Sequence, residues 1–165
     1  MKIIFSSIII FFSFLTISCG SKEYTEEGIV EIVERTDSIL ATLTGQSYNW
    51  ASPKAYSTVM AYYPEPDIIF INENLTYRTP GNSFNRYYIK NGSLIYFIGK
   101  KLDYSYQTNS KISKELSTLT LYLDPDGDVI SYNKIINRQT VSLEDSELKE
   151  IIEHSKELYA LVGNK

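Results

Sequence analysis

The stretch FNRYYIKNGSLIYFIG, residues 84–99, decides the fold. It contains two runs rich in aromatic and apolar residues, 84–90 and 94–99, with Asn91-Gly92 between them. Asn-Gly favours a two-residue hairpin turn because both of its residues accept positive φ angles. Tyr, Ile and Phe suit the half-buried surface of a sheet. The stretch therefore predicts an antiparallel hairpin in the middle of the chain.

Further strands are predicted on both sides of this hairpin. They cover residues 56–63, 68–77, 117–123 and 128–136, and Pro-, Gly- and Asp-rich turns at 64–67, 79–82 and 124–127 separate them. We interpret residues 46–54 as a loop that carries aromatic side chains. Residues 100–115 are polar, which predicts a long loop or a ragged continuation of a strand.

Two amphipathic helices are predicted outside the strands. Apolar residues recur at three- and four-residue steps over 25–43 and again over 148–162. Ser142-Leu143-Glu144-Asp145 resembles a capping box that opens the second helix, and Gly163 closes it. The sequence thus predicts an α+β domain over residues 25–165. It has an N-terminal helix, an antiparallel meander of about six strands and a C-terminal helix, with both helices packed on one sheet face.

The first 19 residues form a separate segment. Lys2 is followed by an apolar run from Ile3 to Ile17, which ends at Ser18-Cys19-Gly20. A cationic start, an apolar middle and small residues at the end are typical of a secretory signal. The run is slightly shorter than the roughly 20 apolar residues that a spanning helix needs. This segment therefore predicts export, and an uncleaved anchor or an ordinary signal with a chance cysteine are the alternatives.

Leu15-Thr16-Ile17-Ser18-Cys19 resembles the lipobox of bacterial lipoproteins, although Thr16 stands where leucine is commonest. The resemblance implies that residues 1–18 are removed and that Cys19 is acylated, with chains such as palmitate. Residues 19–24 would then form a lipidated tether. Gly20 after the cysteine favours the outer membrane where the cell has one. Two or more acyl chains give stable anchoring, so the resemblance predicts a membrane-anchored protein of the cell envelope.

Composition limits the partners of the exported domain. The chain has 16 basic and 20 acidic residues, and its net charge is −4. Nucleic-acid binding depends on neutralising phosphates with Lys and Arg, so a mildly acidic chain without a basic cluster predicts no nucleic-acid partner. Cys19 is the only cysteine, which excludes an internal disulfide. No phosphate-binding loop, zinc spacing or dinucleotide motif occurs, so we expect no cofactor.

Three groups of residues are candidates for metal binding or catalysis. The run Asp124–Asp128 looks like part of a calcium loop, but position 12 would be Ile135 rather than glutamate, so we expect a turn and no metal.

His154, the only histidine, is predicted on the solvated face of its helix beside Glu147, Glu150 and Glu157. A carboxylate pair, Asp67 with Glu73, offers parts for a glycosidase. With no second histidine and no free cysteine, Ser-His and Cys-His nucleophilic schemes lack their parts, and we expect no catalytic residue.

An aromatic surface is the remaining candidate for ligand contact. Neighbouring strand residues face opposite sides of a sheet, so in each adjacent pair one ring should point inward and one outward. The alternative is that these rings pack beneath the helices or beneath residues 100–115. The candidate residues are Tyr48, Trp50, Tyr62, Tyr63, Tyr87, Tyr88, Tyr104 and Tyr106.

The sequence therefore favours a non-catalytic binding or accessory lipoprotein with a protein or glycan partner. An inhibitor of an envelope-attacking enzyme is a second hypothesis, with residues 46–54 or 100–115 as the loop that it presents. A small hydrolase that uses carboxylates is a third.

Overall fold

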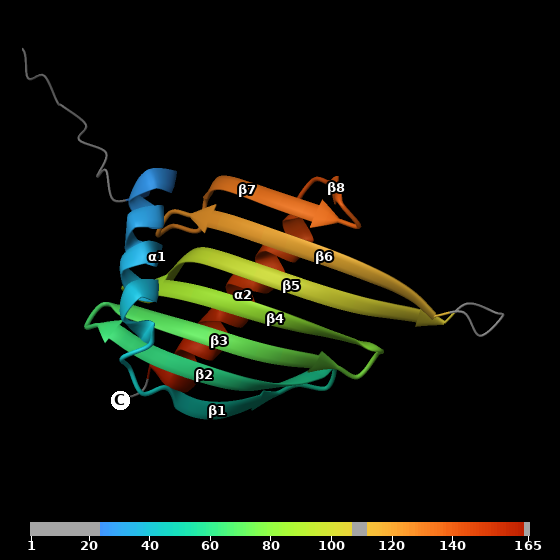
Figure 1. Cartoon of the computed structure of the whole chain (residues 1–165), viewed down its shortest axis with the longest axis horizontal. Coiled ribbons are helices and arrows are strands. Elements are labelled where there is room, and N and C mark those ends of the chain that lie inside the picture. Colours follow the sequence, from blue (N-terminus) through green and yellow to red (C-terminus); the bar gives the residue numbers. More distant parts are fainter. Residues whose placement is uncertain (1–23, 107–111, 164–165) are drawn as a thin grey trace, which may run out of the picture.

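The computed structural model describes residues 24–106 and 112–163, with the side chains of 105, 106, 112 and 113 left aside. Two helices and eight strands make up this part of the chain (Figure 1). In chain order the elements are α1 (Glu26–Leu40), β1 (Gln46–Ala51), β2 (Ala55–Glu65), β3 (Ile68–Tyr77), β4 (Gly81–Lys90), β5 (Ser93–Tyr106), β6 (Ile112–Leu123), β7 (Val129–Ile136), β8 (Gln139–Thr140) and α2 (Asp145–Val162).

The strands form one antiparallel meander in which each strand pairs with the next along the chain. The β4–β5 hairpin lies at its centre, and Asn91 and Gly92 have φ angles of 50° and 83°. These values are those of the favoured two-residue turn, so the hairpin prediction is confirmed. Because all connections are short, the residues at one position on neighbouring strands form continuous rows across the sheet.

Helix α2 covers one face of this sheet. Its buried residues Leu158 and Val162 belong to a core cluster with Ile71, Tyr87 and Leu121 of the strands. Polar contacts fix the same helix: Lys134 of β7 lies 2.6 Å from Glu147, and the hydroxyl of Tyr63 donates to the carbonyl of Val162. This face is therefore closed by α2 over the middle of the sheet.

Helix α1 packs on the other face, at one end of the strands (Figure 1). Thr25 caps it by accepting a hydrogen bond from the backbone N–H of Gly28. Ile29 and Ile32 pack on a row of strand side chains that includes Phe70 and Tyr88. The Asp37 carboxylate accepts from the Tyr88 hydroxyl at 2.6 Å, which ties the helix to β4.

The α+β class, with a helix at each end of an antiparallel meander, is confirmed, but two details of the prediction were wrong. The sheet has eight strands rather than about six, because residues 46–51 form edge strand β1 and residues 139–140 form β8. The two helices lie on opposite faces rather than on one. The reason is visible in Tyr87 and Tyr88, consecutive residues that are both buried, which requires a cover on each face.

The predicted loops and caps also differ in part from the structure. Residues 100–106 continue strand β5, and β6 begins at Ile112, so of the two alternatives for 100–115 the structure has the strand continuation rather than the long loop. Helix α2 begins after Glu144, which makes no side-chain cap, so the capping box at Ser142 was wrong. Gly163 is the C-cap as predicted. Neither helix in the described ranges is both long and apolar enough to cross a bilayer. The leader and Cys19 lie outside those ranges.

Candidate functional site

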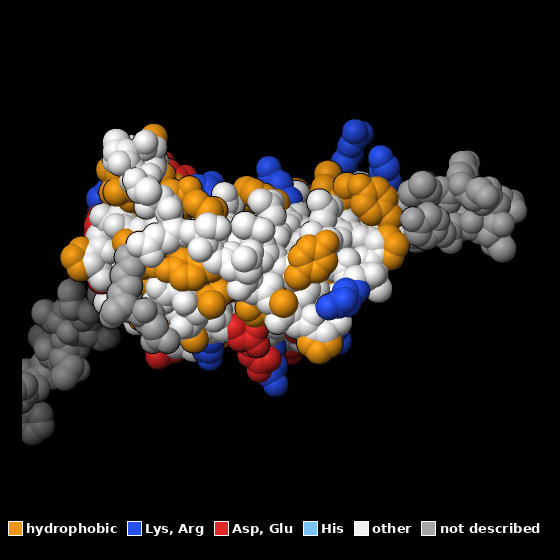
Figure 2. All heavy atoms as spheres, turned by 90° about the horizontal axis from the view of Figure 1, so that it is seen from below, with side chains coloured by type: hydrophobic (Ala, Val, Ile, Leu, Met, Phe, Trp, Pro, Cys, Tyr) orange, Lys and Arg blue, Asp and Glu red, His pale blue; other side chains and the backbone are white. Residues whose placement is uncertain are grey.

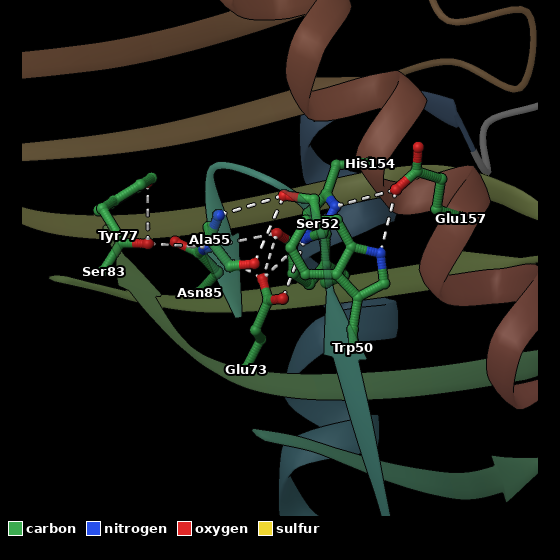
Figure 3. A network of polar contacts seen from close by, with 10 residues as sticks. Trp50, Ser52, Ala55, Glu73, Tyr77, Ser83, Asn85, His154 and Glu157 are labelled. Atoms are coloured by element: carbon green, nitrogen blue, oxygen red, sulfur yellow. Dashed lines mark hydrogen bonds and ion pairs between the residues drawn. The ribbon is translucent and has the colours of Figure 1, made fainter. Parts of the chain in front are cut away.

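The described chain contains two features that could carry a function, and they lie on opposite faces of the sheet. The first is a polar cluster beneath α2, built on Glu73 of β3 and His154 of α2 (Figure 3). The second is the part of the other face that α1 leaves uncovered. Their surroundings decide what each can do.

Glu73 is the centre of the polar cluster. Its side chain is 0% exposed, and its two carboxylate oxygens lie 3.0 and 3.1 Å from Nε2 of His154. The Tyr87 hydroxyl and the Asn85 amide also donate to Oε2, at 2.9 and 3.1 Å. The sheet register explains this arrangement, because Asn85 is directly opposite Glu73 on β4. The carboxylate is thus held by groups from strand β4 and from helix α2.

Trp50 and Glu157 border the cluster on its outer side (Figure 3). The Trp50 indole N–H donates to Oε2 of Glu157 at 3.1 Å, and the same oxygen lies 3.7 Å from Nδ1 of His154. The Trp50 ring meets the His154 ring edge-on, with centroids 4.6 Å apart. His154 therefore lies between a buried and an exposed carboxylate, with its ring held by an aromatic neighbour.

The electrostatics of Glu73 follow from these contacts. Burial alone would raise the pKa of this carboxyl, but the hydrogen bond and charge of His154, together with further hydrogen bonds such as that from Asn85, hold the pKa below its usual 4.5. A carboxylate whose pKa is lowered by folding stabilises the fold fully above the unfolded value. That contribution is lost as the pH falls below 4.5 and through the folded pKa. Burial raises the pKa of Tyr87, and the Glu73 charge adds to the increase. Glu73 is therefore ionised at neutral pH and Tyr87 remains a donor.

The Glu73 carboxylate is inaccessible to a substrate. General acid–base chemistry requires the acting group to come within hydrogen-bond reach of the reacting atom, and Glu73 has no exposed surface. Both of its oxygens already accept hydrogen bonds from within the domain. The arrangement fits a polar clamp between α2 and the sheet. It also shows that the predicted surface position of His154 was wrong, because its side chain is only 17% exposed and points to β3.

On the other face of the sheet, α1 covers only one end. Rows of side chains continue beyond it, and the first of them borders the helix, where Arg86 pairs with Asp37 at 2.9 Å. We call this surface the open face and define it by three rows that follow the strand register. From α1 outward, the rows are Met60–Asn72–Arg86–Ile98–Thr120–Asn133, Thr58–Asn74–Phe84–Lys100–Thr118–Ile135, and Tyr56–Thr76–Asn82–Leu102–Leu116. In Figure 1 this is the front of the sheet beyond α1.

Burial along β4 shows how the two faces differ. Ser83, Asn85 and Tyr87 are buried beneath α2, whereas Phe84 between them is 39% exposed. Tyr56 and Leu116, in the outermost row, are 54% and 52% exposed. Threonine and asparagine side chains lie between these rings and apolar groups. The open face is thus a flat surface that mixes aromatic, apolar and neutral polar groups.

Two shallow grooves lie on this face. The first, of about 470 Å³, lies where the end of α1 meets the sheet, and its lining residues are Leu40, Ala41, Tyr62, Phe70, Asn72, Phe84 and Arg86. The second, of about 430 Å³, lies near the β8 edge and is lined by Leu116, Thr118, Ile135, Asn137 and Arg138. Both fall within the size range of small-ligand sites. The row Phe84–Lys100–Thr118 joins the two grooves, with Lys100 between them.

The aromatic surface predicted from the sequence is not assembled as expected. Tyr87 and Tyr88 are both buried, on opposite faces, so neither points outward. Tyr48, Trp50 and Tyr63 pack against the core beneath α2, and Tyr62 packs against the α1 side. Of the described candidates, Tyr62 lines the first groove of the open face, and Tyr104 lies beside this face in the row beyond Leu102, with Nζ of Lys114 at 5.9 Å from its ring centre. The side chain of Tyr106 is not among those that the structure describes.

The other predicted groups are also separated. Asp67 pairs with Nζ of Lys90 at 2.9 Å near the β2–β3 turn, while Glu73 lies beneath α2, so they form no acid pair. Asp124 accepts from the backbone N–H groups of Asp126 and Asp128, both at 2.9 Å, as expected for a turn. Across the described ranges, no three His, Cys, Asp or Glu residues gather closely enough to hold a metal ion.

Comparison with protein-family models, curated proteins and solved structures gives no match to this chain.

Proposed function

We propose that this chain is a non-catalytic, lipid-anchored binding module of the bacterial cell envelope. Cys19 would hold it to the membrane, and the open face would bind its ligand. The observation that carries the proposal is the contrast between the two faces. One is sealed by α2, and the other presents Tyr56, Phe84 and Leu116 to solvent. Exposed rings and apolar groups gathered on one surface mark interaction sites more often than scattered ones do.

The anchoring half of the proposal rests on the leader. Leu15–Cys19 resembles a lipobox, and Cys19 precedes Tyr24, the first described residue, by five positions. Such a segment spans no more than about 18 Å even when fully extended. An acylated Cys19 would therefore keep the domain next to the lipid surface, within reach of other envelope components.

The non-catalytic half rests on the polar cluster. Glu73 and His154 form a carboxylate–imidazole pair of the kind that acid–base chemistry uses, and their groups satisfy one another beneath α2. A structural clamp explains the same contacts without a substrate. Binding at the open face requires no such chemistry, because rings, hydroxyls and amides recognise ligands through contact and hydrogen bonding.

A second candidate function, an inhibitor of an envelope-attacking enzyme, is favoured by one feature. The β5–β6 hairpin continues past the start of β4, since Gly81 pairs with Asp103 while β5 runs on to Tyr106. Such an arm could be presented to a protein. A cross-linker placed on the open face, compared with one at Lys114 on this arm, separates the two candidates: the first proposal requires the ligand to cross-link from the face.

Replacement of Cys19 by serine tests the anchor. We expect Cys19→Ser to abolish acylation, so that the protein keeps its leader or is released from membranes into the soluble fraction. The measurement is membrane partition together with the intact mass of the purified protein. Ser21→Ala is the matched control and should be acylated and membrane-bound like the parent. Unchanged mass and partition in Cys19→Ser would rule out the lipoprotein assignment.

A further inference from the structure

The charges of the open face differ from those of the chain as a whole. The chain has a net charge of −4, yet the three rows of this face contain Arg86 and Lys100 and no carboxylate. Lys114 lies in the next row and Arg138 lines the second groove. Next to α1, the Asp37 carboxylate accepts from Arg86 and Tyr88 and offsets the Arg86 charge. The local positive charge of the open face therefore comes from Lys100, Lys114 and Arg138, which lie beyond the helix.

The neutral side chains of the face point to a ligand rich in hydroxyl groups. Asn74 and Asn82 lie among Thr58, Thr76, Thr118 and Thr120 on four strands, β2, β3, β4 and β6. Amides and hydroxyls both donate and accept, so they match polyols. The exposed rings of Tyr56 and Phe84 offer apolar faces on which a sugar ring can stack. An anionic bilayer would pair with the cations of the open face but would leave these amide and hydroxyl groups without hydrogen-bond partners.

The geometry indicates the direction in which such a ligand would lie. Neighbouring strands are about 4.8 Å apart, which is comparable to the length of one pyranose ring. The middle row, Asn74–Phe84–Lys100–Thr118, crosses four strands and connects the two grooves. A chain of sugars along this row would place successive rings over successive strands. The cation at Lys100 would meet a charged group midway between the grooves.

We infer that the open face binds an extended acidic polysaccharide, with Phe84 stacking on a sugar ring and Lys100 pairing with its carboxylate or other anionic group. This inference rests on the proposed binding function and names the ligand class for the same face. The attraction between the cations and a polyanion weakens with added salt, while stacking on Phe84 does not depend on charge. The structure therefore predicts a binding site with a charged and an uncharged component.

The test uses the mature acylated protein in detergent micelles and polygalacturonate as the probe. Lys100→Glu and Phe84→Ala should each weaken binding at least tenfold, because the first places a repelling charge at the centre of the site and the second removes the stacking surface. Lys149→Glu is the matched control: it makes the same charge change at a residue whose side chain is 76% exposed on α2. It should leave affinity within twofold.

Three other probes decide between ligand classes. A neutral dextran should bind weakly, and both polyglutamate and vesicles of anionic phospholipid should bind at least tenfold more weakly than polygalacturonate. Equal binding of polyglutamate or of vesicles would overturn the inference, as would the absence of polygalacturonate binding or an equal loss in Lys149→Glu. If polygalacturonate fails to bind while an envelope component still cross-links to the open face, the ligand class is wrong and the proposed binding face stands.

Discussion

Replacement of His154 by leucine is expected to lower the free energy of unfolding by about 3 kcal/mol, because removal of one partner leaves the buried Glu73 charge uncompensated. In the folded protein, Glu73 is 0% exposed and depends on Nε2 of His154 to offset its burial. Tyr87 and Asn85 would still donate to the carboxylate, but both are neutral groups. Chemical denaturation at neutral pH measures the loss.

A double-mutant cycle identifies the cause of that loss. In a Glu73→Gln background, residue 73 carries no charge that needs compensation. The same His154→Leu change should then cost only about 1 kcal/mol, the value of an ordinary hydrogen bond. His154→Leu should also remove the interaction that lowers the pKa of Glu73 and leave burial to raise it. Protonation then relieves the uncompensated buried charge, so the stability deficit of this variant relative to the parent should shrink as the pH falls toward and below 4.5. An equal cost in both backgrounds would show that the His154 ring acts through packing alone.

Leu158→Ala is expected to lower the free energy of unfolding by about 2–5 kcal/mol, the usual cost of truncating a buried leucine. Leu158 is 0% exposed and lies among the side chains with which α2 covers the sheet, including Leu121 and Ile71. Removal of three carbons would leave a cavity at this contact. The effect should appear as a reduced denaturation midpoint with little change in the denaturant slope.

Leu161 provides the matched control for this substitution. It is the same residue type on the same helix, but it is 36% exposed. Leu161→Ala should therefore cost less than about 1 kcal/mol, since surface substitutions have small effects. Similar losses for the two variants would contradict the orientation of α2 on the sheet.

Many of the strands and turns could be predicted from the sequence because their signals depend only on neighbouring residues. Asn91-Gly92 specifies a turn through its own φ angles, and residues 68–77 form β3 with the bounds that alternation and the flanking turns predict. β1 was missed because its alternation is confined to Tyr48 and Trp50 among polar residues, which is too short a pattern to indicate a strand. Its place as a strand depends on pairing with β2. Figure 2, which views the molecule from the β1 side, shows apolar side chains only in separate groups on this edge.

The candidate sites were harder to predict because they depend on contacts between distant elements. Helical spacing placed His154 among glutamates, but it cannot reveal Glu73, which is 81 residues away in sequence. The open face left a clearer signal that could have been used. Phe84, Lys100 and Thr118 occupy even-numbered positions on strands whose even-numbered side chains share one face. The lengths of the turns determine which of these residues lie opposite one another. The sequence could not indicate that α1 would cover only one end of that face.

The most direct measurement of the central claim is site-specific photo-cross-linking in intact envelopes. A cross-linker replaces Asn74, an exposed residue in the middle row of the open face, or Lys149 on the outer side of α2. The account predicts that an envelope component is captured from position 74 and that Phe84→Ala in the same protein reduces the yield. Capture of the same component from position 149 with equal yield, or from neither position, would contradict the assignment of the open face as the binding surface.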